Sequence, residues 1–256
     1  MRLAIDIGNT NIVVGAFRKK ELIFNFRLST DKNKTEYEYA VIFNTIFHTK
    51  NIDKNEINGA IISSVVPVLT KTIEKAVDIF CGITPLILSA GIKTGIDIRT
   101  ENPNQTGADR IADSVGGLMK YNLPLLIIDI GTAVTLSVIN EKRQFVGGII
   151  AAGPRLELSA LKKGTAQLTE VGLHPPDKVI GRNTHNAVSS GIIYGIASML
   201  DSLIFKIKEE IGSQLTVVAT GGMSFEIISC CKSEIIYDEF LLLNGLNHIY
   251  EINVCL

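Results

Sequence analysis

The chain lacks a surplus of either charge. Its 256 residues include 25 Lys and Arg against 26 Asp and Glu, a net charge of -1, and the basic residues are dispersed along the sequence. Proteins that bind nucleic acid usually gather Lys and Arg in a patch or stripe. The sequence therefore predicts no nucleic-acid partner, although a neutral chain can still hold a polyanionic ligand through backbone amides and a metal ion.

Cysteine and histidine are both scarce. The four cysteines, Cys81, Cys230, Cys231 and Cys255, form no Cys-x-x-Cys pair and have no histidine at zinc-finger spacing. This pattern is typical of free thiols in a reducing cytoplasm rather than of a disulfide framework. The four histidines are scattered, which disfavours a metal cluster or a Ser-His-Asp triad.

Long apolar runs are missing as well. No stretch reaches the ~18 uncharged apolar residues that a membrane-spanning helix needs. Asp6 interrupts the only apolar run near the N-terminus, so no secretory signal is visible. We therefore expect a cytoplasmic protein that does not bind a membrane. A chain of this length can bury a core sufficient for one large domain or two small ones.

The chain does contain one short sequence motif that occurs twice. Residues 3–10 read Leu-Ala-Ile-Asp-Ile-Gly-Asn-Thr, and residues 126–133 read Leu-Ile-Ile-Asp-Ile-Gly-Thr-Ala. Each copy is a β-rich strand that ends on Asp-Ile-Gly, turns through small residues and returns as a second apolar run. Asp6 and Asp129 lie 123 positions apart, close to half of the chain. The spacing predicts a duplication, with one metal–phosphate site built from two related halves.

The elements around each copy support a duplication. The first half is predicted to form strands at 2–7, 12–17, 22–28, 59–66 and 85–88 and helices at 35–49 and 69–80. The second half is predicted to form strands at 125–130, 133–139, 145–151, 215–219 and 235–236 and helices at 156–162, 186–211, 223–231 and 240–250. An amphipathic segment, 107–121, joins the halves. We expect an α/β protein of two domains, 1–117 and 118–256, each a mixed sheet flanked by helices.

The first Asp-Ile-Gly turn has the residue types of a phosphate site. Gly8 lets the backbone turn tightly beside a ligand, and the amides of residues 8–11 can form an anion-binding concavity. Thr10 adds a hydroxyl donor, and Asp6 suits Mg²⁺, which prefers oxygen ligands and few carboxylates. One such turn could equally be a hairpin whose aspartate caps local amides. Two copies in register favour the phosphate site.

A third glycine signal occurs at residues 217–223, Val-Val-Ala-Thr-Gly-Gly-Met. A buried strand that ends on two glycines and opens a helix brings backbone close to a flat ring or a phosphate. Taken alone, Gly221-Gly222 is typical of a packing turn. It indicates a nucleotide because it follows the two aspartate turns in order.

The segment between the halves carries the candidate for catalysis. Pro103 and Gly107 fix a loop, after which Asp109 and Arg110 open a helix. Arg110 offers a planar fork that can hold a carboxylate through two hydrogen bonds. Asp109, ionised at a helix N-terminus, is a weak base, yet phosphoryl transfer depends mainly on positioning and charge neutralisation. The alternative is a capping aspartate beside a surface arginine.

The ordered set of motifs resembles a known family over nearly the whole chain. The motifs are Asp-Ile-Gly-Asn-Thr10, Ser-Ser-Val-Val-Pro67, Asn-Pro…Gly-Ala-Asp-Arg110, Asp-Ile-Gly-Thr132, Gly-Gly-Ile-Ile…Gly153, Gly-Thr-Ala-Gln-Leu168 and Thr-Gly-Gly222. Their order is similar to that of type III pantothenate kinases. The resemblance implies an actin-like, sugar-kinase-like ATPase with two ribonuclease-H-like domains around a nucleotide cleft. It also implies that the protein phosphorylates pantothenate with ATP, the first committed step towards coenzyme A.

The resemblance implies a nucleotide site with two kinds of cation. The residues that would line the ATP phosphates are Asp6, Ile7, Gly8, Asn9, Thr10, Asn11, Ile12 and Val13. Asp6 would also hold Mg²⁺, and Asp129 would bind a monovalent cation, K⁺ or NH₄⁺. Thr132, Gly221 and Gly222 would contact ATP.

The resemblance also implies a pantothenate site and a homodimer. Pantothenate would bind at Gly107, Ala108, Asp109 and Arg110, with Asp109 accepting the hydroxyl proton. Thr184 would be a substrate residue near the dimer interface, which the long helix after Asn186 would form.

One position departs from the family pattern. Members usually carry a substrate-contacting Tyr seven residues before the Gly of Gly-Ala-Asp-Arg, where this chain has Thr100. The smaller side chain changes that contact and leaves the phosphate residues intact. Two alternatives are a kinase acting on another small hydroxylated substrate and a non-catalytic nucleotide-binding relative. The presence of Asp6, Asp109 and Asp129 favours an active kinase.

Overall fold

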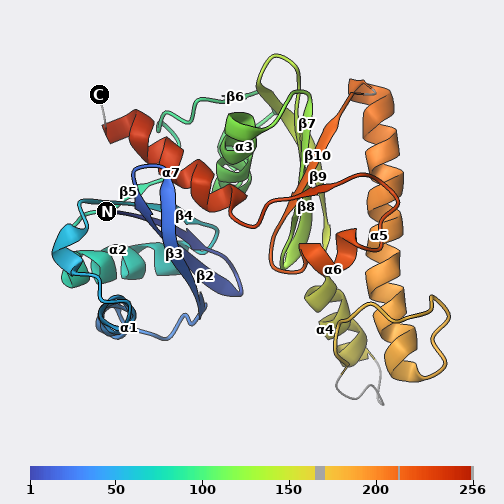
Figure 1. The fold of residues 1–256 in the computed structure, drawn as a ribbon, viewed down its shortest axis with the longest axis horizontal. Helices are drawn as coiled ribbons and strands as arrows, with labels where there is room; N and C mark the ends of the chain where they lie inside the picture. Colours follow the sequence, from blue (N-terminus) through green and yellow to red (C-terminus); the bar gives the residue numbers. More distant parts are fainter. Residues whose placement is uncertain (165–170, 213, 255–256) are drawn as a thin grey trace. The chain divides into compact units, whose positions relative to one another are not determined.

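The computed structural model describes residues 1–164, 171–212 and 214–254, which form two compact units (Figure 1). Unit 1 consists of Met1–Ile96, Glu101–Met119 and the last helix, α7 (Leu241–Val254). Unit 2 consists of Asp97–Thr100 and Lys120–Phe240. Each unit has its own sheet and its own apolar core. Residues 165–168 of the Gly-Thr-Ala-Gln-Leu motif, and Cys255, lie outside the described residues.

The sheet of unit 1 is mixed, as predicted. Its strands, in spatial order, are β3 (Glu21–Ser29), β2 (Asn11–Arg18), β1 (Arg2–Ile7), β4 (Gly59–Ser64) and β5 (Leu86–Ile87). The first three form an antiparallel meander, whereas β4 runs parallel to β1 and β5 runs parallel to β4. β1 is therefore the central strand, with an antiparallel neighbour on one side and a parallel neighbour on the other.

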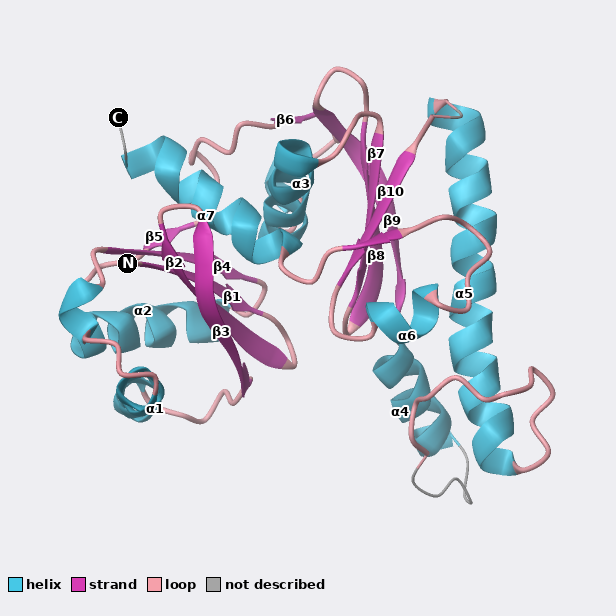
Figure 2. Cartoon of the chain, in the orientation of Figure 1, coloured by secondary structure: helices cyan, strands magenta, loops and turns pink. Residues whose placement is uncertain are grey.

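Two helices cover one face of this sheet (Figure 2). In α1 (Glu36–Thr49), Thr35 and Glu38 form the reciprocal hydrogen bonds of a capping box, which fixes the first residue of the helix. α2 (Pro67–Cys81) begins at Pro67, two residues before the predicted start, because proline is well suited to the first helical position. Both helices bury aromatic and aliphatic side chains, such as Phe43 and Ile73, against the sheet.

The last helix, α7, covers the other face of the unit 1 sheet. Arg2 of β1 forms an ion pair with Glu251 (2.8 Å) and lies over the Tyr250 ring. Gly59 of β4 leaves the space that the Tyr250 ring occupies. α7 therefore belongs with the first unit. This differs from the expected division into 1–117 and 118–256, which followed chain order and could not reveal a return of the chain to β1.

Helix α3 (Ala108–Lys120) packs directly on α7. The two backbones approach closely at Gly116, which faces the backbone of Leu241, and at Gly245, which faces the carbonyl of Ala112. A Cβ atom on either glycine would overlap the opposite backbone. Two short 3₁₀ helices complete the unit, η1 (Lys54–Glu56) and η2 (Pro103–Gln105).

The sheet of unit 2 repeats the topology of unit 1. Its strands, in spatial order, are β11 (Ile236–Tyr237), β10 (Thr216–Thr220), β7 (Leu125–Ile130), β8 (Ala133–Ile139), β9 (Gln144–Ala152) and β6 (Asp97–Ile98). Five of these strands match β5, β4, β1, β2 and β3 in order and direction. The sixth, β6, was not predicted, because its two residues, Asp97 and Ile98, are not part of an apolar run. It is held at the sheet edge by pairing with β9.

The helices of unit 2 are α4 (Pro154–Gly164), α5 (Thr184–Ile211) and α6 (Ser224–Ile228). The last is shorter than predicted and ends before Cys231. By length and composition alone α5 could cross a membrane, but helices in the cores of globular proteins share these two properties. Its side chains, including Ile196 and Leu200, pack in the core of unit 2.

The buried carboxylate of Asp238 connects the first residues of unit 2 with its last residues by hydrogen bonds. Asp238 accepts hydrogen bonds of 2.8 Å from both Lys120 Nζ and Tyr121 OH. The bond to Asp238 raises the pKa of Lys120, and burial followed by the bond to Asp238 raises the pKa of Tyr121. The amide of Asp238 also donates to Ala219 in β10. The two chain segments that enter and leave this unit are thus fixed together.

The close approach of α3 and α7 predicts that Gly245→Ala destabilises the protein, in contrast to Gly→Ala at an open helical position. Gly245→Ala should lower the free energy of unfolding by about 1–3 kcal/mol, because the new methyl group overlaps the Ala112 carbonyl. Gly195→Ala, in α5 with open space at its Cβ, should raise it by about 0.5–1 kcal/mol through helix propensity. Urea denaturation of both variants measures the difference. Equal effects would contradict the packing described for Gly245.

Candidate functional site

The first aspartate turn, between β1 and β2, is held by hydrogen bonds from Thr30, the residue that follows β3. The amide of Gly8 donates to the carbonyl of Asn11 (3.0 Å), which closes the turn between β1 and β2. From the end of β3, the Thr30 amide donates to the Thr10 carbonyl (2.9 Å) and the Thr30 hydroxyl donates to the Gly8 carbonyl (2.6 Å). Asn9 and Thr10 lie exposed at the tip. The turn that begins two residues after Asp6 is therefore held in one shape.

The second aspartate turn repeats these contacts. The Gly131 amide donates to the Ala133 carbonyl (2.9 Å), and the Gly153 amide donates to the Thr132 carbonyl (3.0 Å). Gly131, Thr132 and Gly153 thus take the places of Gly8, Thr10 and Thr30. The predicted duplication is present in the hydrogen bonds of the turns as well as in the order of the strands.

The two turns differ in length by one residue. Asp6 pairs with Val13 across the first hairpin, seven positions on, whereas Asp129 pairs with Thr135, six positions on. The extra residue in the first turn is Asn9. The first turn consequently presents one more backbone amide than the second, which suits it better to an anion.

The strand-end residues close the two turns in different ways. In unit 1, Thr30 uses its hydroxyl on the Gly8 carbonyl. In unit 2, a Cβ atom on Gly153 would overlap the carbonyl oxygens of Gly131 and Thr132. Only glycine permits that close backbone approach. This accounts physically for the glycine at the end of the Gly-Gly-Ile-Ile…Gly153 motif.

The Gly221-Gly222 turn lies against the second aspartate. Gly221 has a φ of 99°, and a Cβ atom there would overlap Asp129 Oδ1 and the backbone of Ile130. The Met223 amide donates to the Ile130 carbonyl (3.3 Å). The structure therefore brings Gly221 to Asp129, although they lie far apart in the sequence. Gly222, the next residue, is exposed.

Asp109 and Arg110 open α3, as predicted. Gly107 precedes the helix, and a Cβ atom on it would overlap Asp109 Oδ1, so glycine leaves room for the carboxylate. Arg110 is half-buried, which lowers its pKa, and the negative charges of Asp109 and Asp113 oppose that shift. Asp113 itself is only 2% exposed. The Arg110 guanidinium thus lies in the field of two carboxylates on its own helix.

The predicted substrate residues Thr100 and Thr184 lie in unit 2. Thr100 follows β6, where the Arg99 amide bonds to the Phe145 carbonyl (2.8 Å). The Thr100 hydroxyl is buried and forms no hydrogen bond within the described residues. Thr184 is the exposed first residue of α5, and its neighbour Asn183 caps the helix by accepting a bond from the Asn186 amide (2.8 Å).

The donor set favours a metal that binds few protein ligands. Each turn supplies one aspartate, Asp6 or Asp129, and residues 1–164, 171–212 and 214–254 contain no group of three or more His, Cys, Asp or Glu side chains arranged around a metal. Mg²⁺ commonly binds through one or two carboxylates and nucleotide phosphates while keeping several waters. The turns fit that ion, whereas zinc needs a fuller set of ligands.

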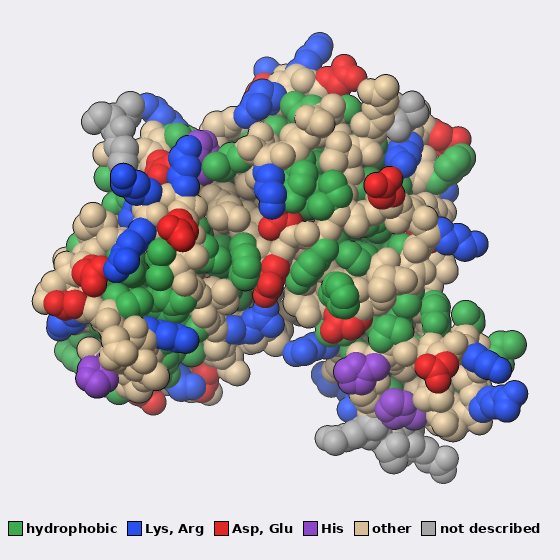
Figure 3. All heavy atoms as spheres, viewed as in Figure 1, with side chains coloured by type: hydrophobic (Ala, Val, Ile, Leu, Met, Phe, Trp, Pro, Cys, Tyr) green, Lys and Arg blue, Asp and Glu red, His purple; other side chains and the backbone are tan. Residues whose placement is uncertain are grey.

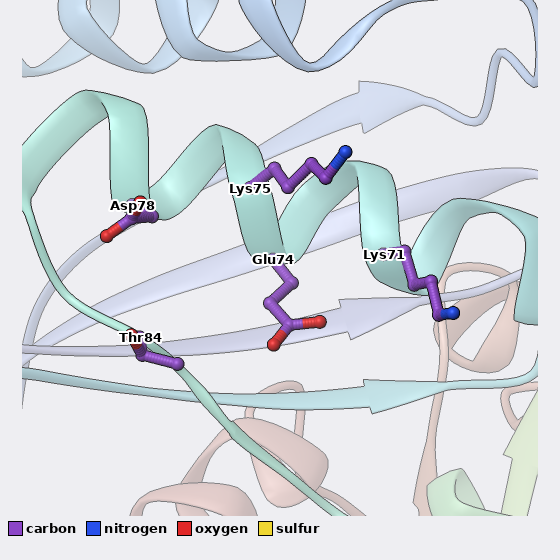
Figure 4. Close-up of a pocket in the computed structure, with 5 residues that line it drawn as sticks. All are labelled: Lys71, Glu74, Lys75, Asp78 and Thr84. Carbon is purple, nitrogen blue, oxygen red and sulfur yellow. The ribbon is translucent and has the colours of Figure 1, made fainter.

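A shallow pocket lies along α2 in unit 1. It is lined by Lys71, Glu74, Lys75 and Asp78 of α2 and by Thr84, as Figure 4 shows. Lys75 approaches Glu36 of α1 at 3.8 Å, and the charges along the pocket alternate in sign. On the face drawn in Figure 3, Lys and Arg side chains are likewise interleaved with Asp and Glu. The pocket has the character of a solvated helix face and contains none of the predicted site residues.

Sequence reasoning missed Thr30 as a residue that shapes the site. It carries no motif, and the only local signal is a hydroxyl residue directly after a strand. Its partners, Gly8 and Thr10, lie about twenty positions earlier in the chain. Only the pairing of β2 with β3 brings them together.

The contact between Gly221 and Asp129 predicts a specific loss of stability. Gly221→Ala should lower the free energy of unfolding by about 2–5 kcal/mol, because left-handed strain adds to overlap with Asp129 and Ile130. Gly147→Ala is the matched control, since Gly147 has a φ of 138° but open space at its Cβ. It should lose only about 1–2 kcal/mol. Similar losses in the two variants, measured by urea denaturation, would show that Gly221 does not contact the aspartate.

Comparison with known proteins agrees with this geometry. The sequence profile of the family described as type III pantothenate kinase matches residues 2–206. A type III pantothenate kinase of an Exiguobacterium species is 41% identical over 253 residues, covering 99% of each chain.

Two solved structures show the same fold at low identity. A conserved putative Baf family transcriptional activator from Campylobacter jejuni has a TM-score of 0.59 and 20% identity, covering 99% of this chain and 100% of its own. The activator of 2-hydroxyisocaproyl-CoA dehydratase from Clostridium difficile, with bound ADPNP, has a TM-score of 0.57 and 11% identity, covering 98% and 95%.

These two likenesses show that the pair of matched sheets is a fold shared with other proteins. The profile match and the 41% identity over the full length identify the family, whereas the structural likenesses identify the fold alone. The chain belongs to the type III pantothenate kinase family.

Proposed function

We propose that the protein transfers the γ-phosphoryl group of ATP to the hydroxyl of pantothenate, giving 4'-phosphopantothenate, with Asp109 as the proton acceptor. The reaction is assigned from family membership, because a type III pantothenate kinase phosphorylates pantothenate in coenzyme A biosynthesis. The assignment of residues is our own inference. The observation that supports it best is the pair of matched aspartate turns, of which the longer suits a polyphosphate.

The first turn is the proposed phosphate and magnesium site, comprising residues 6–13. Its amides and the Thr10 hydroxyl would bind the phosphate oxygens, and Asp6 would hold Mg²⁺ directly or through water. Bound Mg²⁺ neutralises part of the charge on the transferring group. The pinning of this turn by Thr30 supports the role, since preorganised donors need no rearrangement during reaction.

The second turn is the proposed monovalent-cation site. Asp129 would bind K⁺ or NH₄⁺, while Thr132 and the Gly221-Gly222 turn would contact ATP. The close approach of Gly221 to Asp129 supports this pairing, because it sets backbone beside the carboxylate. A monovalent cation there would complement the negative charge of the carboxylate.

The start of α3 is the proposed acceptor site. Asp109 would orient and deprotonate the pantothenate hydroxyl, and Arg110 would bind the pantothenate carboxylate through its planar fork. The room that Gly107 leaves for the Asp109 carboxylate supports the first role. We place Ala108, Thr100 and Thr184 among the other substrate contacts, with Thr100 offering a shorter side chain than the usual Tyr.

The proposed setting is a cytoplasmic homodimer. α5 is the candidate for the contact between subunits because it combines a buried face with exposed apolar side chains, including Phe205 at 62% exposure. Thr184 begins this helix, so a contact along it would bring the substrate residue near a second subunit.

Replacing the proposed base should stop turnover and spare nucleotide binding. Asp109→Asn keeps the size of the side chain but cannot accept the hydroxyl proton, so kcat should fall by about 10²- to 10⁴-fold. ATP affinity, measured by nucleotide-dependent thermal stabilisation, should stay within about twofold, because the phosphates are assigned to another turn. Glu36→Gln, also in the first turn of a unit 1 helix, controls for loss of a charge at a helix start. Near-normal turnover in Asp109→Asn would refute the assignment.

The substrate assignment is tested by release of ADP. Wild-type protein with ATP, Mg²⁺ and K⁺ should release ADP with pantothenate and not with a panel of sugars, and mass spectrometry should identify 4'-phosphopantothenate. Omitting K⁺ and NH₄⁺ tests the cation assignment in the same assay. Release with a sugar but not with pantothenate would overturn the substrate, and binding of ATP without any release would indicate a non-catalytic relative.

A further inference from the structure

Ser63 is the polar neighbour of Asp6 within the sheet. In the parallel pairing of β1 and β4, Asp6 is the register partner of Ser63, so both side chains leave the sheet on the same face. The opposite face carries Ile5 and Ile62, which pack in the core of unit 1. On its other side Asp6 pairs with Val13, whose side chain has no polar atom.

The Ser63 hydroxyl is buried without a partner. Its side chain is 0% exposed, and the hydroxyl forms no hydrogen bond within the described part of the chain. Leaving such a group unsatisfied costs about 1–3 kcal/mol. Ser64 shows the contrast, because its hydroxyl accepts bonds from the Val66 amide (3.1 Å) and the Thr70 hydroxyl (2.9 Å). Buried hydroxyls normally find a partner, an ordered water or a ligand.

Unit 2 repeats the pairing of an aspartate with a hydroxyl residue. Asp129 has Thr220 as its register partner on the parallel strand β10, and Thr220 is 4% exposed. β10 holds the same place in its sheet as β4 holds in unit 1. A buried hydroxyl residue beside the aspartate is therefore a feature of both halves, present although apolar residues fill most other central positions of these strands.

We propose that Ser63 is a positioning residue of the magnesium site: its hydroxyl and the Asp6 carboxylate together bind one water of the hydrated Mg²⁺ that accompanies ATP. The inference rests on the proposed role of Asp6. Mg²⁺ keeps several of its waters when bound to nucleotides, and those waters need protein acceptors or donors. Adjacent strands lie about 4.8 Å apart, a separation at which a serine and an aspartate in register can share one water. Ser63 thus acts on the ion through that water.

Removing the Ser63 hydroxyl should weaken only the Mg²⁺-dependent part of the stabilisation by nucleotide. The readout is the unfolding temperature of the full chain with a fixed concentration of a non-hydrolysable ATP analogue, measured across a Mg²⁺ titration. Ser63→Ala should raise the Mg²⁺ concentration for half-maximal stabilisation by about tenfold, as expected for a group in the outer shell of a metal. Stabilisation by the analogue without Mg²⁺ should equal that of wild type. Ser63→Thr, which restores a hydroxyl, should return the Mg²⁺ midpoint towards the wild-type value.

Ser64→Ala is the matched control. It should lower the unfolding temperature of the ligand-free chain, because the Val66 amide and the Thr70 hydroxyl lose an acceptor, and leave the Mg²⁺ midpoint unchanged. If Ser63→Ala fails to fold, Ser63→Cys replaces it, since a thiol of similar size is a weak donor.

Two results would overturn the role of Ser63. One is a wild-type Mg²⁺ midpoint in the variant without the hydroxyl, and the other is an equal loss of stabilisation with and without Mg²⁺. If wild-type protein itself shows no Mg²⁺ response, the assignments of Asp6 and Ser63 are both wrong. The experiment contains no pantothenate, so its outcome is separate from the substrate assignment.

Discussion

The site depends on a carboxylate near the carboxyl end of each central strand. Asp6 and Asp129 are the next-to-last residues of β1 and β7, each between an antiparallel and a parallel neighbour. A partly buried carboxylate is costly unless polar groups or cations surround it. In the turns and on the side of the parallel neighbour, the residues beside it are accordingly small or polar: the turn glycines, the hydroxyl residues Ser63 and Thr220, and Gly221. A metal ion or a cation is the natural complement of such an arrangement.

The two halves share one plan but are not equivalent. The first turn has one residue more and is closed by a side-chain hydroxyl, that of Thr30. The second turn is shorter and is closed by backbone, with Gly153 and Gly221 both lying where no side chain fits. More amides favour an anion, whereas a carboxylate enclosed by backbone favours a cation. The proposed division between ATP phosphates and a monovalent cation follows from this difference.

The helix that carries Asp109 is held by a contact made far along the chain. α3 packs on α7 through Gly116 and Gly245, and α7 is fixed to β1 by the Arg2–Glu251 ion pair. A base for phosphoryl transfer must be placed accurately, because positioning supplies much of the rate. The last fourteen described residues, Leu241–Val254, therefore support a residue more than a hundred positions earlier.

The sequence alone determined the strands other than β6, the long helices and the duplication, because these rest on local periodicity and on a repeated sequence motif. Strands 2–7, 125–130 and 133–139 were predicted with their observed limits, and Asp109 does open a helix. Only the tertiary structure decided what no local pattern records. Strand pairing brings Thr30 to the first turn and Ser63 to Asp6, the α3–α7 contact joins the last helix to unit 1, and backbone approach sets Gly221 against Asp129. The reason is physical: periodicity reports which face of an element is buried, whereas the partner on that face depends on chain crossings between distant segments.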